Sequence, residues 1–147
     1  MKSMSLILGV CFIFCLNSCG QDFRKLSGSE VDSKKVQIAN KFATDYLMNL
    51  KNGSYYQFKD EAIDGIKNAF TEETQKTVYQ QLKGQFGDFQ GLEYAETWIQ
   101  SGNPAIKIFR FKSDFEKSTK KLEVRVVLNE SDKIAGFWIK PWSDMLK

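Results

Sequence analysis

One carboxylate in this sequence has the neighbours that a general base needs. Glu96 lies between Tyr94 and Trp98 in a segment that alternates like a β-strand, so a period of two places the three side chains on one face. If that face lines a hollow, burial in apolar surroundings raises the pKa of the Glu96 carboxyl group. Tyr94 or Tyr46 would then supply a hydrogen-bond donor, and the pair could move a proton without any histidine.

The alternative for Glu96 is a structural role. Its side chain would then face water or pair with a cation on a neighbouring strand, and Arg110 and Arg125 are the obvious partners, being mid-strand cations. Each arginine could equally bind an anionic ligand. The candidate ligand-binding residues are Trp98, Phe109, Arg110 and Phe111.

Three acidic residues lie close together in a predicted second helix. Asp60 and Asp64 are spaced i, i+4 and share a helix face, with Glu61 beside them. A hard cation such as Ca²⁺, or a basic partner, could bind such a patch, but a Ca²⁺ site needs six or more oxygens that converge from a loop. A solvated helix face is the simpler interpretation, so no metal site is predicted.

The residue types that are missing exclude several chemistries. The chain has no histidine, which removes Ser-His-Asp and Cys-His catalysis and most transition-metal sites. Its three cysteines, Cys11, Cys15 and Cys19, all lie near the N-terminus, so the rest of the chain has no disulfide and no thiol nucleophile. No cofactor is expected, and a non-enzyme is favoured over an enzyme.

Residues 1–19 have the pattern of a bacterial signal sequence. Lys2 supplies the positive charge, and residues 6–16 form an uncharged apolar run of 11 residues. That length fits the hydrophobic region of a signal peptide and falls short of the roughly 20 residues that cross a bilayer. Such a run could belong to an ordinary secretory signal, to a short membrane anchor or to a lipoprotein signal.

The end of this run resembles the lipobox of bacterial lipoproteins. Leu16 lies three residues before Cys19, and the small residue Ser18 lies directly before it, whereas Asn17 is a less usual occupant of the middle position. The resemblance favours the lipoprotein signal and implies that the sulfur of Cys19 carries a lipid. The protein is then expected at the cell envelope, anchored to a bacterial membrane, with the leaflet left open.

The chain after Cys19 is close to neutral. Only Lys2 of the 21 basic residues precedes Cys19, so 20 basic and 18 acidic residues come after it. This balance, with lysines scattered along the sequence, argues against a nucleic-acid partner, which needs basic residues clustered on one face. The polar residues 20–32 predict a flexible tether, and residues 33–147 have the size of one domain.

Hydrophobic periodicity predicts helices first and strands afterwards. Spacings of three and four predict helices over residues 33–50, 54–69 and 71–86, with Asp32 or Ser33 capping the first and Thr71 the third. Alternation predicts strands over residues 92–99, 105–115, 120–128 and 134–139. This order predicts an α+β fold in which N-terminal helices pack on a curved antiparallel sheet of about four strands.

Short motifs mark the boundaries of these elements. They are Asn52-Gly53, Thr71-Glu72-Glu73, Phe86-Gly87-Asp88-Phe89 and Lys133-Ile134-Ala135-Gly136-Phe137. With these motifs in this order, residues 36–141 resemble an uncharacterised family of bacterial exported domains with the nuclear-transport-factor-two-like (cystatin-like) cone fold. That fold class contains dehydratases, isomerases and many binding domains, so the resemblance implies a fold and assigns no catalytic residue.

The sequence leaves three functions open. The first is a non-catalytic envelope lipoprotein whose domain binds a hydrophobic or amphipathic ligand, or an envelope protein, through its hollow or its open sheet face. The second is a cofactor-free isomerase or dehydratase that uses Glu96 as its base. The third is a purely structural or interaction module, and a homodimer is possible in each case.

Overall fold

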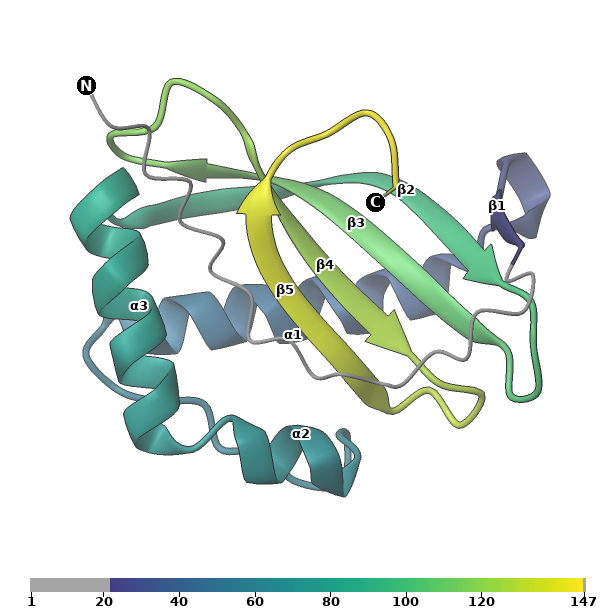
Figure 1. The fold of residues 1–147 in the computed structure, drawn as a ribbon, viewed down its shortest axis with the longest axis horizontal. Helices are drawn as coiled ribbons and strands as arrows, with labels where there is room; N and C mark the ends of the chain where they lie inside the picture. The colour runs from purple at the N-terminus through teal and green to yellow at the C-terminus, as the bar shows by residue number, and fades with distance from the viewer. Residues whose placement is uncertain (1–21, 147) are drawn as a thin grey trace.

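A five-stranded antiparallel sheet lies against three α-helices in the computed structural model, which describes residues 22–146 (Figure 1). The helices are α1 (Ser33–Lys51), α2 (Asp64–Ala69) and α3 (Glu72–Phe86). The strands, in chain order and also in sheet order, are β1 (Phe23–Lys25), β2 (Phe89–Gln100), β3 (Ile106–Phe115), β4 (Leu122–Leu128) and β5 (Ile134–Pro141). The predicted α+β class is therefore confirmed, with five strands where about four were predicted.

The segment before α1 is folded onto the sheet, although the sequence predicted a tether over residues 20–32. Strand β1 pairs with the end of β2, and the buried Leu26 donates its N–H to the carbonyl of Thr97 at 2.9 Å. Arg24 and Glu30 form an ion pair of 2.7 Å across the following turn. The tether prediction is wrong for this stretch because Leu26 buries its side chain against the domain.

The predicted leader and the lipid on Cys19 lie outside the described residues, so the structure leaves both as predictions. Between Asp22 and Leu146, no helix combines the length and the apolar character that crossing a bilayer requires.

Helix α1 forms as its sequence predicts. The carboxylate of Asp32 caps it by accepting the N–H groups of Lys34 at 3.0 Å and Lys35 at 3.3 Å. The helix stops at Asn52, and Gly53 follows with a φ of 79°, a conformation that favours glycine. Its buried stripe consists of Ala39, Phe42, Ala43, Tyr46, Leu47 and Leu50.

The second predicted helix is much shorter than expected. Only Asp64–Ala69 is helical, because the buried side chain of Gln75 pairs with the backbone of Tyr56, its amide donating to the carbonyl and its oxygen accepting the N–H, each at 2.9 Å. Asp60 therefore precedes α2, and the predicted helix face that it shares with Asp64 does not form.

A β-bulge in β2 decides which face of the sheet its side chains occupy. Tyr94 pairs with Phe111, but the next paired residue is Glu96, opposite Arg110, so one extra residue lies between them. Tyr94 consequently packs against Phe111 on the helix side, whereas Glu96 meets Trp98 and Arg110 on the other side. The prediction that Tyr94, Glu96 and Trp98 share one face is wrong because the bulge interrupts the period of two.

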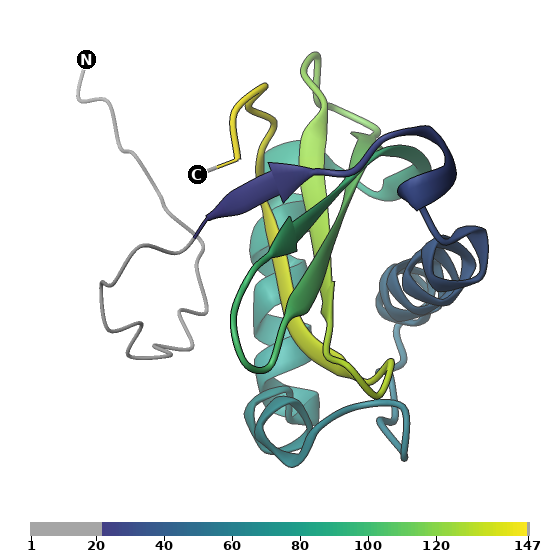
Figure 2. The same cartoon turned by 90° about the vertical axis from the view of Figure 1, so that its right-hand side faces the viewer.

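The two faces of the sheet have different covers. Aromatic rings fill the layer between α1 and the sheet, where Tyr46 lies 4.8 Å from Phe137 and Phe42 lies 5.2 Å from Phe137, measured between ring centroids. We refer to the opposite face as the outer face; it carries Ile108, Arg110 and Lys112 of β3 and Glu123, Arg125 and Val127 of β4. Figure 2 shows α1 on one side of the sheet and the segment after β5 on the other.

Two glycines at the end of α3 give a matched test of this fold. Gly87 has a φ of 77°, and a Cβ built on it would lie 2.9 Å from the Cβ of Glu116. Gly84 is helical and has open space around it. We expect Gly87→Ala to lower the free energy of unfolding by about 1–3 kcal/mol, and Gly84→Ala to raise it by about 0.5–1 kcal/mol.

Urea denaturation followed by circular dichroism measures both variants. Equal effects of the two substitutions would contradict a helix end that depends on the positive φ of Gly87.

Candidate functional site

The structure does not bring the predicted catalytic residues together. Tyr46 is 1% exposed between α1 and the sheet, and within residues 22–146 its hydroxyl has no hydrogen-bond partner. Burial raises the pKa of Tyr46 well above its usual range. The hydroxyl of Tyr94 bonds to that of Thr97 at 2.8 Å on the helix side. Glu96 lies on the outer face, so neither tyrosine is beside it.

Glu96 is a paired carboxylate. It accepts a hydrogen bond from the indole of Trp98 at 2.9 Å, lies 2.6 Å from the Nζ of Lys25, and pairs with Arg110. Burial acts to raise its pKa, but the bonds from Lys25 and Trp98 and the charge of Arg110 outweigh burial, so the pKa is lowered. The expected rise in pKa is therefore wrong, and the structural alternative, pairing with Arg110, is what the structure contains.

The four predicted ligand-binding residues also divide between the two faces. Phe109 and Phe111 are buried on the helix side, where they pack in the core. Arg110 and Trp98 lie on the outer face. Alternation along β3 already separates residue 110 from its two neighbours, so a single site lined by all four was not compatible with a regular strand.

Arg110 is the centre of a buried ion-pair network on the outer face. The network consists of Glu96, Arg110, Glu123 and Arg125. The guanidinium of Arg110 donates to both carboxylate oxygens of Glu123, at 3.0 and 2.9 Å, and Arg125 donates to Glu123 at 2.6 Å. Arg110 and Glu123 are each 0% exposed. Because an unpaired buried charge is strongly destabilising, we assign this network a structural role.

The segment after β5 covers this network. The indole of Trp142 lies against Arg110, with the guanidinium carbon 4.4 Å from the ring centroid, and Arg110 also donates to the carbonyl of Ser143. Burial acts to raise the pKa of Glu123, but hydrogen bonds from Arg110 and Arg125 lower it overall. Glu123 is therefore ionised at neutral pH despite its burial.

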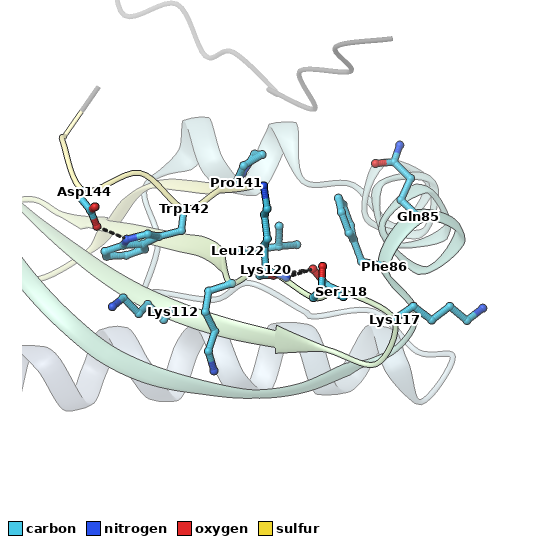
Figure 3. A pocket seen from close by; sticks show the side chains of 12 residues that line it. Gln85, Phe86, Lys112, Lys117, Ser118, Lys120, Leu122, Pro141, Trp142 and Asp144 are labelled. Carbon is cyan, nitrogen blue, oxygen red and sulfur yellow. Dashed lines mark hydrogen bonds between the residues drawn. The ribbon is translucent and has the colours of Figure 1, made fainter. Parts of the chain in front are cut away.

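Beside Trp142 lies a cavity of about 630 Å³, which we name the lysine groove. Phe86 of α3, Leu122 of β4, and Pro141 and Trp142 supply its large apolar side chains (Figure 3). Four lysines and one carboxylate also line it: Lys112, Lys117, Lys120, Lys121 and Asp144. The groove thus combines an apolar surface with an excess of positive charge.

Part of that positive charge is available to a ligand. Lys121 pairs with Asp114 at 2.5 Å, and the Nζ of Lys112 lies 4.9 Å from the centroid of the Trp142 ring. Lys117 and Lys120 are exposed, and no carboxylate in the described part of the chain pairs with either. An anionic group could therefore bind to either lysine without displacing an internal partner.

Sequence reasoning missed this groove because the lysines looked scattered. Three of them lie within five residues, at the turn between β3 and β4, which was a usable local signal. Phe86 and Trp142 reach the same place only through tertiary packing, which no local pattern indicates.

The acidic residues of the predicted patch have other roles. Glu61 accepts hydrogen bonds from the hydroxyl of Tyr56 and the N–H of Lys59, each at 3.0 Å. Asp64 lies 2.8 Å from the Nζ of Lys67. Across residues 22–146, no three acidic side chains converge where a metal ion could bind.

These features define an α+β domain in which α1 packs across one face of an antiparallel sheet, an arrangement compatible with the nuclear-transport-factor-two-like class. Residues 43–137 match the family described as "Protein of unknown function (DUF3887)", and the chain belongs to this family. The match runs from α1 to β5 and includes all four members of the ion-pair network. Searches of curated proteins and of solved structures found no significant match.

Replacing Arg110 tests the role of the ion-pair network. We expect Arg110→Met to lower the free energy of unfolding by about 3–5 kcal/mol at neutral pH, because Glu123 and Glu96 stay buried without this partner. The control is Lys121→Met, which removes an exposed ion pair with Asp114 and should change stability by less than about 1 kcal/mol. Urea denaturation measures both.

The same variant should depend on pH in a defined direction. Because the pKa of Glu123 is lowered in the wild-type fold, its paired carboxylate stabilises that fold at pH values above the ordinary glutamate pKa. This stabilisation is lost as the pH falls through the lowered pKa. Without Arg110, burial raises the pKa of Glu123, so in acid this carboxylate becomes protonated and the variant no longer contains its destabilising buried charge. The stability difference between the two proteins should therefore narrow from about pH 7 to about pH 3; a constant difference would contradict the assigned role.

Proposed function

We propose that this chain is a lipid-anchored cell-envelope protein whose domain binds an anionic amphiphile in the lysine groove and catalyses no reaction. The observation that carries the proposal is one cavity that combines the apolar side chains of Phe86 and Trp142 with Lys117 and Lys120, which pair with no carboxylate of residues 22–146. A carboxylate or phosphate group would pair with the lysines, while an acyl chain would pack on the apolar surface. The cavity volume, about 630 Å³, lies in the usual range for small-molecule sites.

The anchor part of the proposal rests on the sequence. The apolar run of residues 6–16, followed by Ser18 and Cys19, resembles a lipobox. We also assign the domain to the cone fold, and its support is the packing of α1 on one face of an antiparallel sheet together with the family membership.

An isomerase or dehydratase is the second candidate, and it has less support. Both oxygens of Glu96 already accept contacts from Lys25, Trp98 and Arg110. A lowered pKa makes this carboxylate a weaker base than an ordinary glutamate.

Titration of the purified mature protein with dodecyl phosphate, below its micelle concentration, tests the groove. We expect saturable binding by isothermal titration calorimetry, and binding about tenfold weaker or more for the double variant Lys117→Gln/Lys120→Gln, because each lysine contributes a charge-assisted contact. Dodecanol and inorganic phosphate, which each lack one half of the amphiphile, should bind more weakly.

The matched control is Lys34→Gln/Lys133→Gln, which removes two exposed lysines that do not line the groove. Equal affinity of the two double variants, or tighter binding of dodecanol than of dodecyl phosphate, would refute the proposed ligand class.

Expression of Cys19→Ala tests the anchor. The wild-type protein should take up labelled fatty acid and partition into the detergent phase of a Triton X-114 extract, and the variant should do neither. A variant that still incorporates lipid would show that Cys19 is not the modified residue.

A further inference from the structure

Very little chain separates the proposed anchor from the folded domain. Only residues 20–22 lie between Cys19 and Phe23, where β1 begins. An extended chain advances at most about 3.6 Å per residue, so the four steps from Cys19 to Phe23 span at most about 14 Å. If Cys19 is lipidated, as the proposed function holds, β1 and the surface next to it are kept close to the bilayer.

The lysine groove belongs to that same surface. Lys25 of β1 lines a second cavity, of about 420 Å³, together with Lys112, Trp142 and Asp144. The last three residues also line the lysine groove, so the two cavities share a wall. Figure 2 shows β1 and the segment after β5 projecting from the same side of the sheet, away from α1.

Charge distinguishes this surface from the helical layer. Residues 32–88, which contain the helices, include eight basic and eight acidic residues. The lysine groove and the second cavity are together lined by five lysines and three carboxylates. An anionic bilayer therefore attracts the groove side of the domain more strongly than the helical side.

Two exposed apolar side chains belong to the segments that border the second cavity. Phe23 of β1 is 45% exposed and Met145, just after Asp144, is 66% exposed. Apolar side chains beside basic ones favour the interface between lipid headgroups and acyl chains. The basic residues and the two exposed apolar side chains are therefore both suited to contact with the membrane that the anchor would enter.

We propose that the lysine groove, with Phe23 and Met145, docks on the anionic phospholipid headgroups of the membrane that carries the anchor. Phosphate groups of the lipids pair with Lys117 and Lys120, and α1 faces away from the bilayer (Figure 2). The ligand of the proposed function is then a lipid of the host membrane itself, and not a molecule carried through solution.

A fluorescent probe on the mature lipoprotein tests this orientation. In the proposed lipoprotein, Cys11 and Cys15 are removed with the leader and a diacylglyceryl thioether blocks the sulfur of Cys19, so an introduced cysteine is the one free thiol. NBD is attached to Thr119→Cys, which lines the groove, or to Asn68→Cys, which is exposed on α2. Each protein is reconstituted in vesicles of phosphatidylcholine alone or with about one-third phosphatidylglycerol.

We expect the Thr119 probe to brighten and shift to the blue only in the phosphatidylglycerol vesicles, and to revert at high salt. The Asn68 probe should not respond. In the Lys117→Gln/Lys120→Gln background, the ratio of docked to undocked protein should fall by about 25-fold, since each lysine near an anionic surface contributes about fivefold. The Lys34→Gln/Lys133→Gln background should retain the response.

Four results would overturn the inference. A Thr119 probe that behaves identically in both vesicles refutes docking and leaves the anchor intact. A response from the Asn68 probe assigns the membrane to the helical layer instead. Binding of soluble dodecyl phosphate without any probe response would make the groove a site for free amphiphiles. Intact mass spectrometry that shows no lipid on Cys19 would reject both the anchor and the docking that depends on it.

Discussion

The pairing of Arg110 with Glu123 is the interaction on which the rest of this structure depends. Both side chains are completely buried, yet they lie on the outer face, opposite the helical layer. Burial of two charges is tolerated only when their hydrogen-bonding groups are satisfied. The contacts from Glu96, Arg125, Ser143 and Trp142 meet this requirement, so β2, β3, β4 and the segment after β5 must all be in place together.

The bulge in β2 makes this arrangement possible. With a regular strand, Glu96 would follow Tyr94 onto the helix side, and its charge would enter the aromatic layer around Tyr46 and Phe137. The extra residue turns the carboxylate toward Arg110, while Tyr94 remains in the core. One local irregularity therefore separates the polar network from the apolar packing on the two faces of a single sheet.

Much of the fold could be predicted from the sequence, because its signals are local. The stripe from Ala39 to Leu50 and the alternation from Leu122 to Leu128 each define an element and its buried face. The bulge, the pairing of β1 and the non-helical chain around Tyr56 could not, since each depends on a partner far away in sequence. The lysine groove had only a partial signal, in the lysines at residues 117–121, because its apolar surface comes from α3 and from the end of the chain.

The distribution of indole side chains has a practical consequence. All three tryptophans of this chain lie at the outer face: Trp98 bonds to Glu96, Trp138 pairs across from Arg125, and Trp142 stacks on Arg110. The helical layer holds phenylalanine and tyrosine, whose emission is weaker and lies at shorter wavelength. Tryptophan fluorescence excited at the red edge of the absorption band therefore reports on events at the outer face of the sheet and does not report on the helical layer.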